Sequence, residues 1–143
     1  MEKNNFGKLV FSGYDIEPNT QLACWAMSGA YLSSNKKAAV AFAMAHTYAG
    51  RLFNKAAASK DAEIIKIVSD ATKVPPPLIE AAAPRWTWFT EDGTPNIPSC
   101  MAQGRFWNET MKMVSGTVKE EQLFDLSPAI EANQALAKSN PFG

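Results

Sequence analysis

Residues 35–57, which read NKKAAVAFAMAHTYAGRLFNKAA, carry the strongest structural signal in this chain. Asn35 is a residue type favoured at helix N-caps, and behind it apolar side chains recur at every fourth position. They are Val40, Met44, Tyr48 and Leu52. Residues four apart share one face of an α-helix, and further apolar residues widen that face to roughly two thirds of the circumference. The stretch therefore predicts a central helix that is the most buried element of the protein.

Capping and turn residues predict four more helices along the rest of the chain. Each begins at a Ser, Asn or Pro, which are typical of helix N-termini. They are a helix capped by Ser59, a short helix over 77–83, a helix from Asn96 to about Val114, and a helix from Ser127 to about Lys138. Pro84 is expected to end the short helix, because the residue before a proline is pushed out of the α region.

Two short apolar segments before the central helix are interpreted as strands. Residues 8–12 form a β-type run that a glycine ends. Residues 21–27 are almost wholly apolar, and in so short a run periodicity does not separate a buried strand from a helix; we favour a strand. The predicted fold class is therefore mainly α with a few short strands (α+β). It is expected as one domain over 1–143, with the hinge and strands in 7–32 and the helical part in 35–139.

The composition is that of a globular domain and excludes several classes of protein. The 143 residues are 46% hydrophobic and 20% charged, and 14 basic residues balance 14 acidic ones. A chain without net charge has no global field to attract nucleic acid or an anionic membrane. No apolar run reaches the roughly 18 residues of a transmembrane helix. We therefore expect neither a nucleic-acid partner nor membrane insertion.

The residues that could carry chemistry are few, and their spacing predicts no catalytic or metal site. His46 is the single histidine, and its place at the border of the apolar helix face favours a structural role. Cys24 and Cys100 have no metal-ligand spacing and no nearby base, so we expect small core hydrophobes without a required disulfide. The sequence contains no phosphate-binding glycine loop and no paired-carboxylate motif. It therefore predicts a protein that is not an enzyme and that holds no cofactor or metal.

Residues 85–89, RWTWF, leave two interpretations open. Alternating aromatic side chains form stacking platforms for sugars or bases in some proteins, and they equally well pin a loop to a hydrophobic body. Because no cluster of Lys or Arg surrounds Trp86 and Trp88, packing is the favoured interpretation.

The order of several short motifs along the whole chain is distinctive. It begins with GKLVFSGYDIEPN at 7–19, followed by an apolar segment and by LSSN at 32–35, which opens the alanine-rich helix. It continues with PRWTW at 84–88, DGTPN at 92–96 and FDLS at 124–127. This order resembles the C-terminal half of the nitrate-, sulfonate- and taurine-type substrate-binding proteins of ABC importers. That superfamily also includes proteins that handle the thiamine pyrimidine precursor.

The resemblance implies that this chain forms the C-terminal part of a two-lobed α/β periplasmic-binding-protein fold. In that family a strand reaches a Gly-x-Asp-Ile-x-Pro-like hinge, here at 13–18, and crosses into the other lobe. The edge of the ligand cleft would then lie near Tyr14, Asp15 and Asn19, which are the candidate ligand-binding residues. The implied partners are a small-molecule ligand, if binding is retained, and an ABC permease; the implied location is the periplasm.

The chain also departs from the family pattern. A complete binding protein of this type is about twice as long, and the half that supplies much of the ligand pocket has no counterpart here. No apolar h-region follows the N-terminus, so no signal peptide is expected and the chain as written would be cytoplasmic. Asn35-Lys36-Lys37 stands where the family has an Asn-Pro-Glu-like cap, without the proline.

Two functions are compatible with these features. The first is a solute-binding component of an importer, or a truncated piece of one, for a small organic or inorganic solute. The alternative is a non-catalytic helical interaction or structural protein that derives from the same fold and is no longer active in transport. Exposed apolar patches are rare on monomers, so we expect a homodimer with residues 8–31 at or near its interface. We expect no tight anion binding, because residues 9–35 contain no Lys or Arg.

Overall fold

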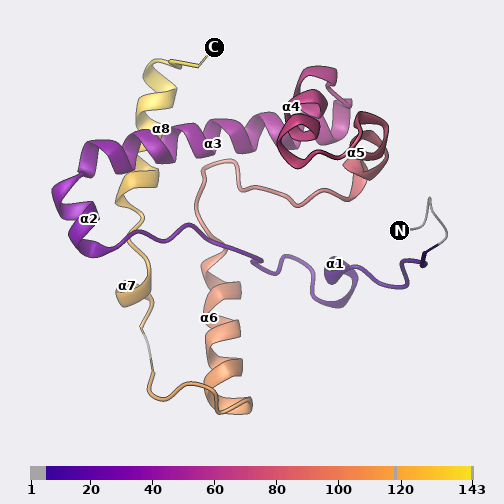
Figure 1. Cartoon of the computed structure of the whole chain (residues 1–143). Helices are drawn as coiled ribbons and strands as arrows, with labels where there is room; N and C mark the ends of the chain where they lie inside the picture. Colours follow the sequence, from indigo (N-terminus) through magenta and orange to yellow (C-terminus); the bar gives the residue numbers. More distant parts are fainter. Residues whose placement is uncertain (1–5, 118, 143) are drawn as a thin grey trace. The chain divides into compact units, whose positions relative to one another are not determined.

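The computed structural model describes residues 6–117 and 119–142. Within these ranges every regular element is helical (Figure 1), so the predicted α+β class is wrong and the described chain is all-α. The expected strands at 8–12 and 21–27 are irregular backbone instead, and the α/β architecture implied by the resemblance is corrected with them. A strand is stable only when another strand takes up its backbone hydrogen bonds, and neither segment has such a neighbour within the described ranges.

Two compact units make up the described chain. The first combines residues 6–26 with 95–124, and the second combines 27–94 with 125–142. A domain can contain two such units, so a single domain over 1–143 stays a prediction.

Helix α6 (Ile97–Arg105) is the main element of the first unit. Asn96 caps it as predicted, because its side-chain oxygen accepts a hydrogen bond from the backbone N–H of Ser99. A π-helical turn, η3 (Phe106–Thr110), follows, and the helical stretch ends there and not at Val114. The unit also holds two short helices, α1 (Gly13–Ile16) and α7 (Glu120–Leu123).

The second unit contains the long helix and its neighbours. They are α2 (Gly29–Ser34), α3 (Lys36–Ser59), α4 (Ala62–Thr72), α5 (Pro76–Ala82), the 3₁₀ turn η2 (Ala83–Arg85) and α8 (Ser127–Lys138). The predicted long and C-terminal helices are confirmed. Asp61 caps α4 in place of Ser59, because its carboxylate accepts hydrogen bonds from two backbone N–H groups. A carboxylate there also interacts favourably with the positive end of the helix dipole.

The buried face of α3 differs from the predicted one. Small and polar residues form it, namely Ala39, Thr47, Gly50, Asn54 and Ala56. Met44, Tyr48 and Leu52, from the predicted stripe, are only half-buried. The reason is the loop that follows η2, since Gly50 lies directly beside Phe89 of this loop. Small side chains leave room for a loop backbone, whereas large ones would hold it away.

Asn54 holds this loop against α3. Its side-chain nitrogen donates to the carbonyl oxygen of Phe89 over 2.6 Å, and its side-chain oxygen accepts from the backbone N–H of Phe89 over 3.1 Å. Both polar groups of the Phe89 backbone are thus paired by one buried amide. The loop needs such a partner, because it has no strand or helix hydrogen bonds of its own.

Helix α8 crosses α3 (Figure 1) and contributes the buried Ala132 and Leu136. Asn133 of α8 donates to the carbonyl oxygen of Asp92 and accepts a 2.7 Å hydrogen bond from the Arg51 guanidinium of α3. Asn133 therefore ties α8 to both α3 and the loop.

The two tryptophans of the loop have different environments. Trp86 stacks on Phe53 with ring centroids 4.4 Å apart, so packing is confirmed as its role. Trp88 is 69% exposed.

His46 lies between two aromatic rings, and its protonation should make the free energy of unfolding depend on pH. It stacks on Phe42 and meets Phe89 edge-on, with ring centroids 6.2 and 5.7 Å apart. Burial disfavours the imidazolium, so the pKa of His46 lies below its ordinary value. The unfolded chain then binds the proton more readily, and the free energy of unfolding should fall as the pH drops below about 6.5.

Urea unfolding at pH 7.5 and pH 5.5 measures this dependence, with His46→Phe as the matched variant. Phenylalanine keeps an aromatic ring but does not titrate, so the difference between the two pH values should shrink in the variant. Greater stability of the parent protein at pH 5.5 would contradict the assignment.

Candidate functional site

The side chains of the first unit are less buried than those of the second unit. Every buried residue of the described chain lies in the second unit, whereas the first unit contains only half-buried and exposed residues. Helix α6 is therefore accessible over much of its surface. Two of its faces carry organised groups of side chains, and each face is a candidate for function.

One face of α6 holds an extended piece of the N-terminal segment. The backbone N–H of Gln21 donates to Ser99 Oγ over 2.9 Å, and Gln103 Nε2 donates to the Gln21 carbonyl oxygen over 2.9 Å. The side-chain oxygen of Gln21 accepts from the backbone N–H of Asn96 over 2.7 Å. Side chains of α6 thus satisfy the backbone groups that a neighbouring strand would otherwise pair.

The same face brings the two cysteines together. Cys24 Sγ and Cys100 Sγ are 3.9 Å apart, although 76 positions separate them in the sequence. Cys24 is exposed and Cys100 half-buried, so the expectation of two core hydrophobes is wrong. Burial and the neighbouring Cys24 thiol raise the pKa of Cys100. A raised pKa keeps Cys100 protonated at neutral pH, which is the opposite of an activated nucleophile.

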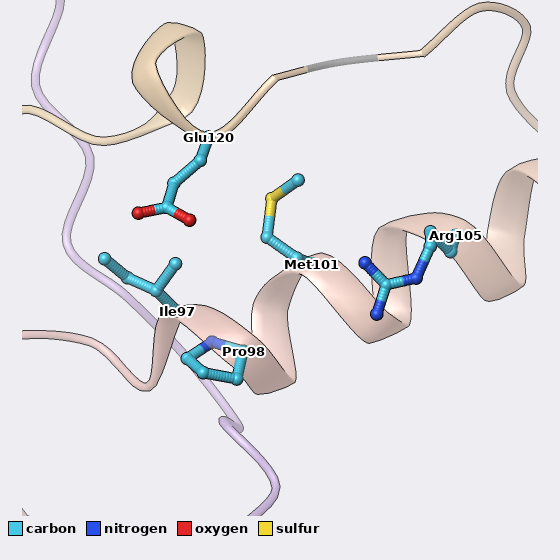
Figure 2. Close-up of a pocket in the computed structure, with 5 residues that line it drawn as sticks. All are labelled: Ile97, Pro98, Met101, Arg105 and Glu120. Carbon is cyan, nitrogen blue, oxygen red and sulfur yellow. The ribbon is translucent and has the colours of Figure 1, made fainter.

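The other face of α6 lines a hollow of about 590 Å³. Ile97, Pro98, Met101 and Arg105 come from α6, and Glu120 comes from α7. Figure 2 shows the Glu120 carboxylate and the Arg105 guanidinium on either side of Met101 in this view. The hollow thus combines an apolar floor with one positive and one negative group.

The residues of this hollow were not among the sequence candidates, although a signal for them exists. Ile97, Met101 and Arg105 are four residues apart, which places them on one face of a helix. What the sequence does not reveal is that α7 brings Glu120 to the same face.

A second hollow, of about 330 Å³, lies in the second unit beside α2, α3 and the start of α8. Its lining includes Lys36, Asp125 and Ser127. Lys36 forms an ion pair with Glu131, and hydrogen bonding to this carboxylate raises the pKa of Lys36. The Ser127 side chain and backbone N–H lower the pKa of Asp125 by hydrogen bonding to its carboxylate. Because the ammonium group already has a carboxylate partner, this hollow is a weaker candidate for an anion.

The three sequence-predicted ligand residues have separate roles. Asp15 closes a capping box with Ser12 at the start of α1, where its carboxylate accepts from the Ser12 N–H over 2.7 Å. Asn19 adopts a left-handed turn with φ of 64°, and its carbonyl oxygen accepts from the Asn96 side chain. Tyr14 is 67% exposed. None of the three lines either hollow.

The described residues form no metal centre and no membrane-spanning helix. Within residues 6–117 and 119–142, no group of three or more His, Cys, Asp or Glu residues is placed to hold a metal ion. In the same ranges no helix combines the length and apolar character that crossing a bilayer requires. Comparisons with protein-family models, curated proteins and solved structures find no match for this chain.

Proposed function

We propose that this chain acts as a solute-binding component of an importer, or as part of one, for a small solute of the sulfonate, taurine or nitrate class. The observation that carries the proposal is the hollow on α6. Its volume of about 590 Å³ falls in the range of small-molecule sites, roughly 300–1,000 Å³. Its apolar floor with two charged groups is also the usual composition of such sites.

The charges of the hollow favour a zwitterionic solute over a simple anion. A guanidinium such as that of Arg105 binds a sulfonate or carboxylate through two parallel hydrogen bonds. The Glu120 carboxylate would accept hydrogen bonds from an ammonium group on the same molecule, while it would repel a second anion. An aminosulfonate such as taurine therefore suits the hollow better than nitrate does.

The hollow is open to solvent, which limits affinity. Its charged residues Arg105 and Glu120 are both exposed, and solvent screens charge pairing at such positions. We expect dissociation constants weaker than about 1 μM for this chain alone. An opposing protein surface, such as an ABC permease or a second lobe, would have to cover the solute for tight binding.

Calorimetry with a panel of solutes tests this proposal. The panel is taurine, ethanesulfonate, nitrate, bicarbonate and a thiamine-type hydroxymethylpyrimidine. Taurine should bind most tightly, and Arg105→Gln should weaken it about tenfold, because one charge-assisted pair is lost. The matched control is Lys37→Gln, which removes a positive charge from an exposed position of α3 outside both hollows. Equal loss in the two variants, or no binding of any solute, would contradict the proposal.

A second candidate function is that of a non-catalytic interaction protein, and one observation favours it. Large apolar side chains of the first unit are exposed, among them Leu22 at 73% and Trp25 at 68%. Exposed apolar groups of this size mark interaction surfaces when they occur together. The simplest partner is a second copy of the chain, with residues 8–31 at the interface of a homodimer.

Sedimentation equilibrium at high micromolar concentration tests the homodimer. The parent chain should sediment as a dimer, and Trp25→Lys should shift it toward the monomer, because a charge would be placed in the apolar contact. Trp88→Lys is the matched control, since Trp88 is equally exposed but lies in the second unit. A well-folded monomeric parent would remove the support for this candidate.

A further inference from the structure

We infer that Cys24 and Cys100 form an oxidisable dithiol, a modification site that joins the N-terminal segment covalently to α6. Both thiols are free, and their Sγ atoms are 3.9 Å apart. A disulfide bond is about 2.05 Å long, so the two sulfur atoms need to approach by a further 2 Å or so. Rotation of a cysteine side chain about its Cα–Cβ bond moves the sulfur through such a distance.

Hydrogen bonds on either side of the cysteine pair hold the N-terminal segment against α6. Gln21 precedes Cys24 by three residues and is fixed to Ser99 and Gln103, which flank Cys100 on the same side of α6. Asn19 is tied to the cap of this helix through the Asn96 side chain. The two thiols therefore lie close together because hydrogen bonds anchor the N-terminal segment to α6. The dithiol does not depend on solute binding in the hollow.

The exposure of the two thiols determines the order of reaction with a small-molecule disulfide such as oxidised glutathione. The exposed Cys24 thiolate attacks one glutathione sulfur, forms a mixed disulfide and releases one glutathione thiolate. Cys100, after losing its proton to solvent, attacks Cys24 Sγ and releases the second glutathione thiolate, which takes up a proton. The two protein thiols are oxidised to one disulfide, and one glutathione disulfide is reduced to two thiols. Because burial raises the pKa of Cys100, the second step should accelerate as the pH rises.

The disulfide would add a covalent link to a segment that hydrogen bonds already hold on α6. Trp25 lies next to Cys24 and is 68% exposed, so chymotrypsin can cut the chain after it when the segment opens. Oxidation should slow this cut about tenfold, because proteolysis follows local opening. Cleavage after Trp88, in the other unit, provides the internal control.

Mass spectrometry of dilute protein treated with oxidised glutathione tests the inference. The parent chain should lose both thiols, gain no glutathione and become lighter by two hydrogen atoms. Cys24→Ser and Cys100→Ser should each retain one glutathione, because the resolving thiol is absent. In urea, closure of the parent chain should slow by about tenfold or more, since the pair is no longer held together. A parent chain that keeps one glutathione beside a free thiol, closes equally fast in urea, or forms disulfides only between molecules would overturn the inference.

Discussion

Asn54→Ala should destabilise the second unit by about 2–3 kcal/mol, the cost of leaving buried backbone groups unpaired. Asn54 is only 8% exposed, and its amide pairs with both the N–H and the carbonyl of Phe89. Alanine removes both hydrogen bonds. Phe89 lies outside any helix or strand, so no regular hydrogen bond replaces them at its N–H and carbonyl groups. Urea unfolding followed by Trp fluorescence measures the change, because Trp86 stacks in the same loop.

Asn35→Ala is the matched control for this prediction. Asn35 has the same side chain and precedes the same helix, but makes no side-chain cap hydrogen bond. Its replacement should change the free energy of unfolding by less than about 0.5 kcal/mol. Similar losses for the two variants would show that Asn54 does not anchor the loop.

Gly93→Ala should cost about 3 kcal/mol, from a strained backbone and a steric clash together. The backbone of Gly93 has φ of +69°, and a Cβ atom there would lie 2.3 Å from Thr47 Oγ1. Thr47 is 2% exposed, and close packing around a buried side chain resists its displacement. Thermal unfolding monitored by circular dichroism would report the loss.

Gly116→Ala separates the two contributions. Gly116 also has a positive φ, of +86°, but open space surrounds the position of its Cβ. This variant should cost about 1 kcal/mol from the backbone alone. A second check is the double variant with Thr47→Ala, which removes the clashing oxygen and should recover about 1–2 kcal/mol relative to the sum of the single changes. Equal costs for Gly93→Ala and Gly116→Ala would contradict the clash.

The elements that could be predicted are those whose signals are local. The apolar spacing and length of 35–57 identify α3, and Asn96 caps α6 through a bond to a residue three positions away. The strands at 8–12 and 21–27 could not be judged in this way. An apolar run of that length fits several conformations, and its outcome depends on which element lies beside it.

The candidate site was less predictable, because its parts come from distant stretches of the chain. Cys24 meets Cys100 across 76 positions, and Gln21 meets Gln103 across 82. The presence of Glu120 in the hollow likewise depends on the position of α7. The prediction of Tyr14, Asp15 and Asn19 depends on resemblance to a hinge strand, and the segment that carries them is not a strand.

NMR of the methionine methyl groups reports on solute binding in the hollow on α6. Met101 lines the hollow, whereas Met44 lies on α3 in the other unit. During a taurine titration the Met101 resonance should shift and saturate in the parent chain and in Lys37→Gln, and should shift far less in Arg105→Gln. A Met101 resonance that stays fixed throughout the titration, or a shift at Met44 in its place, would show that the hollow does not bind the solute.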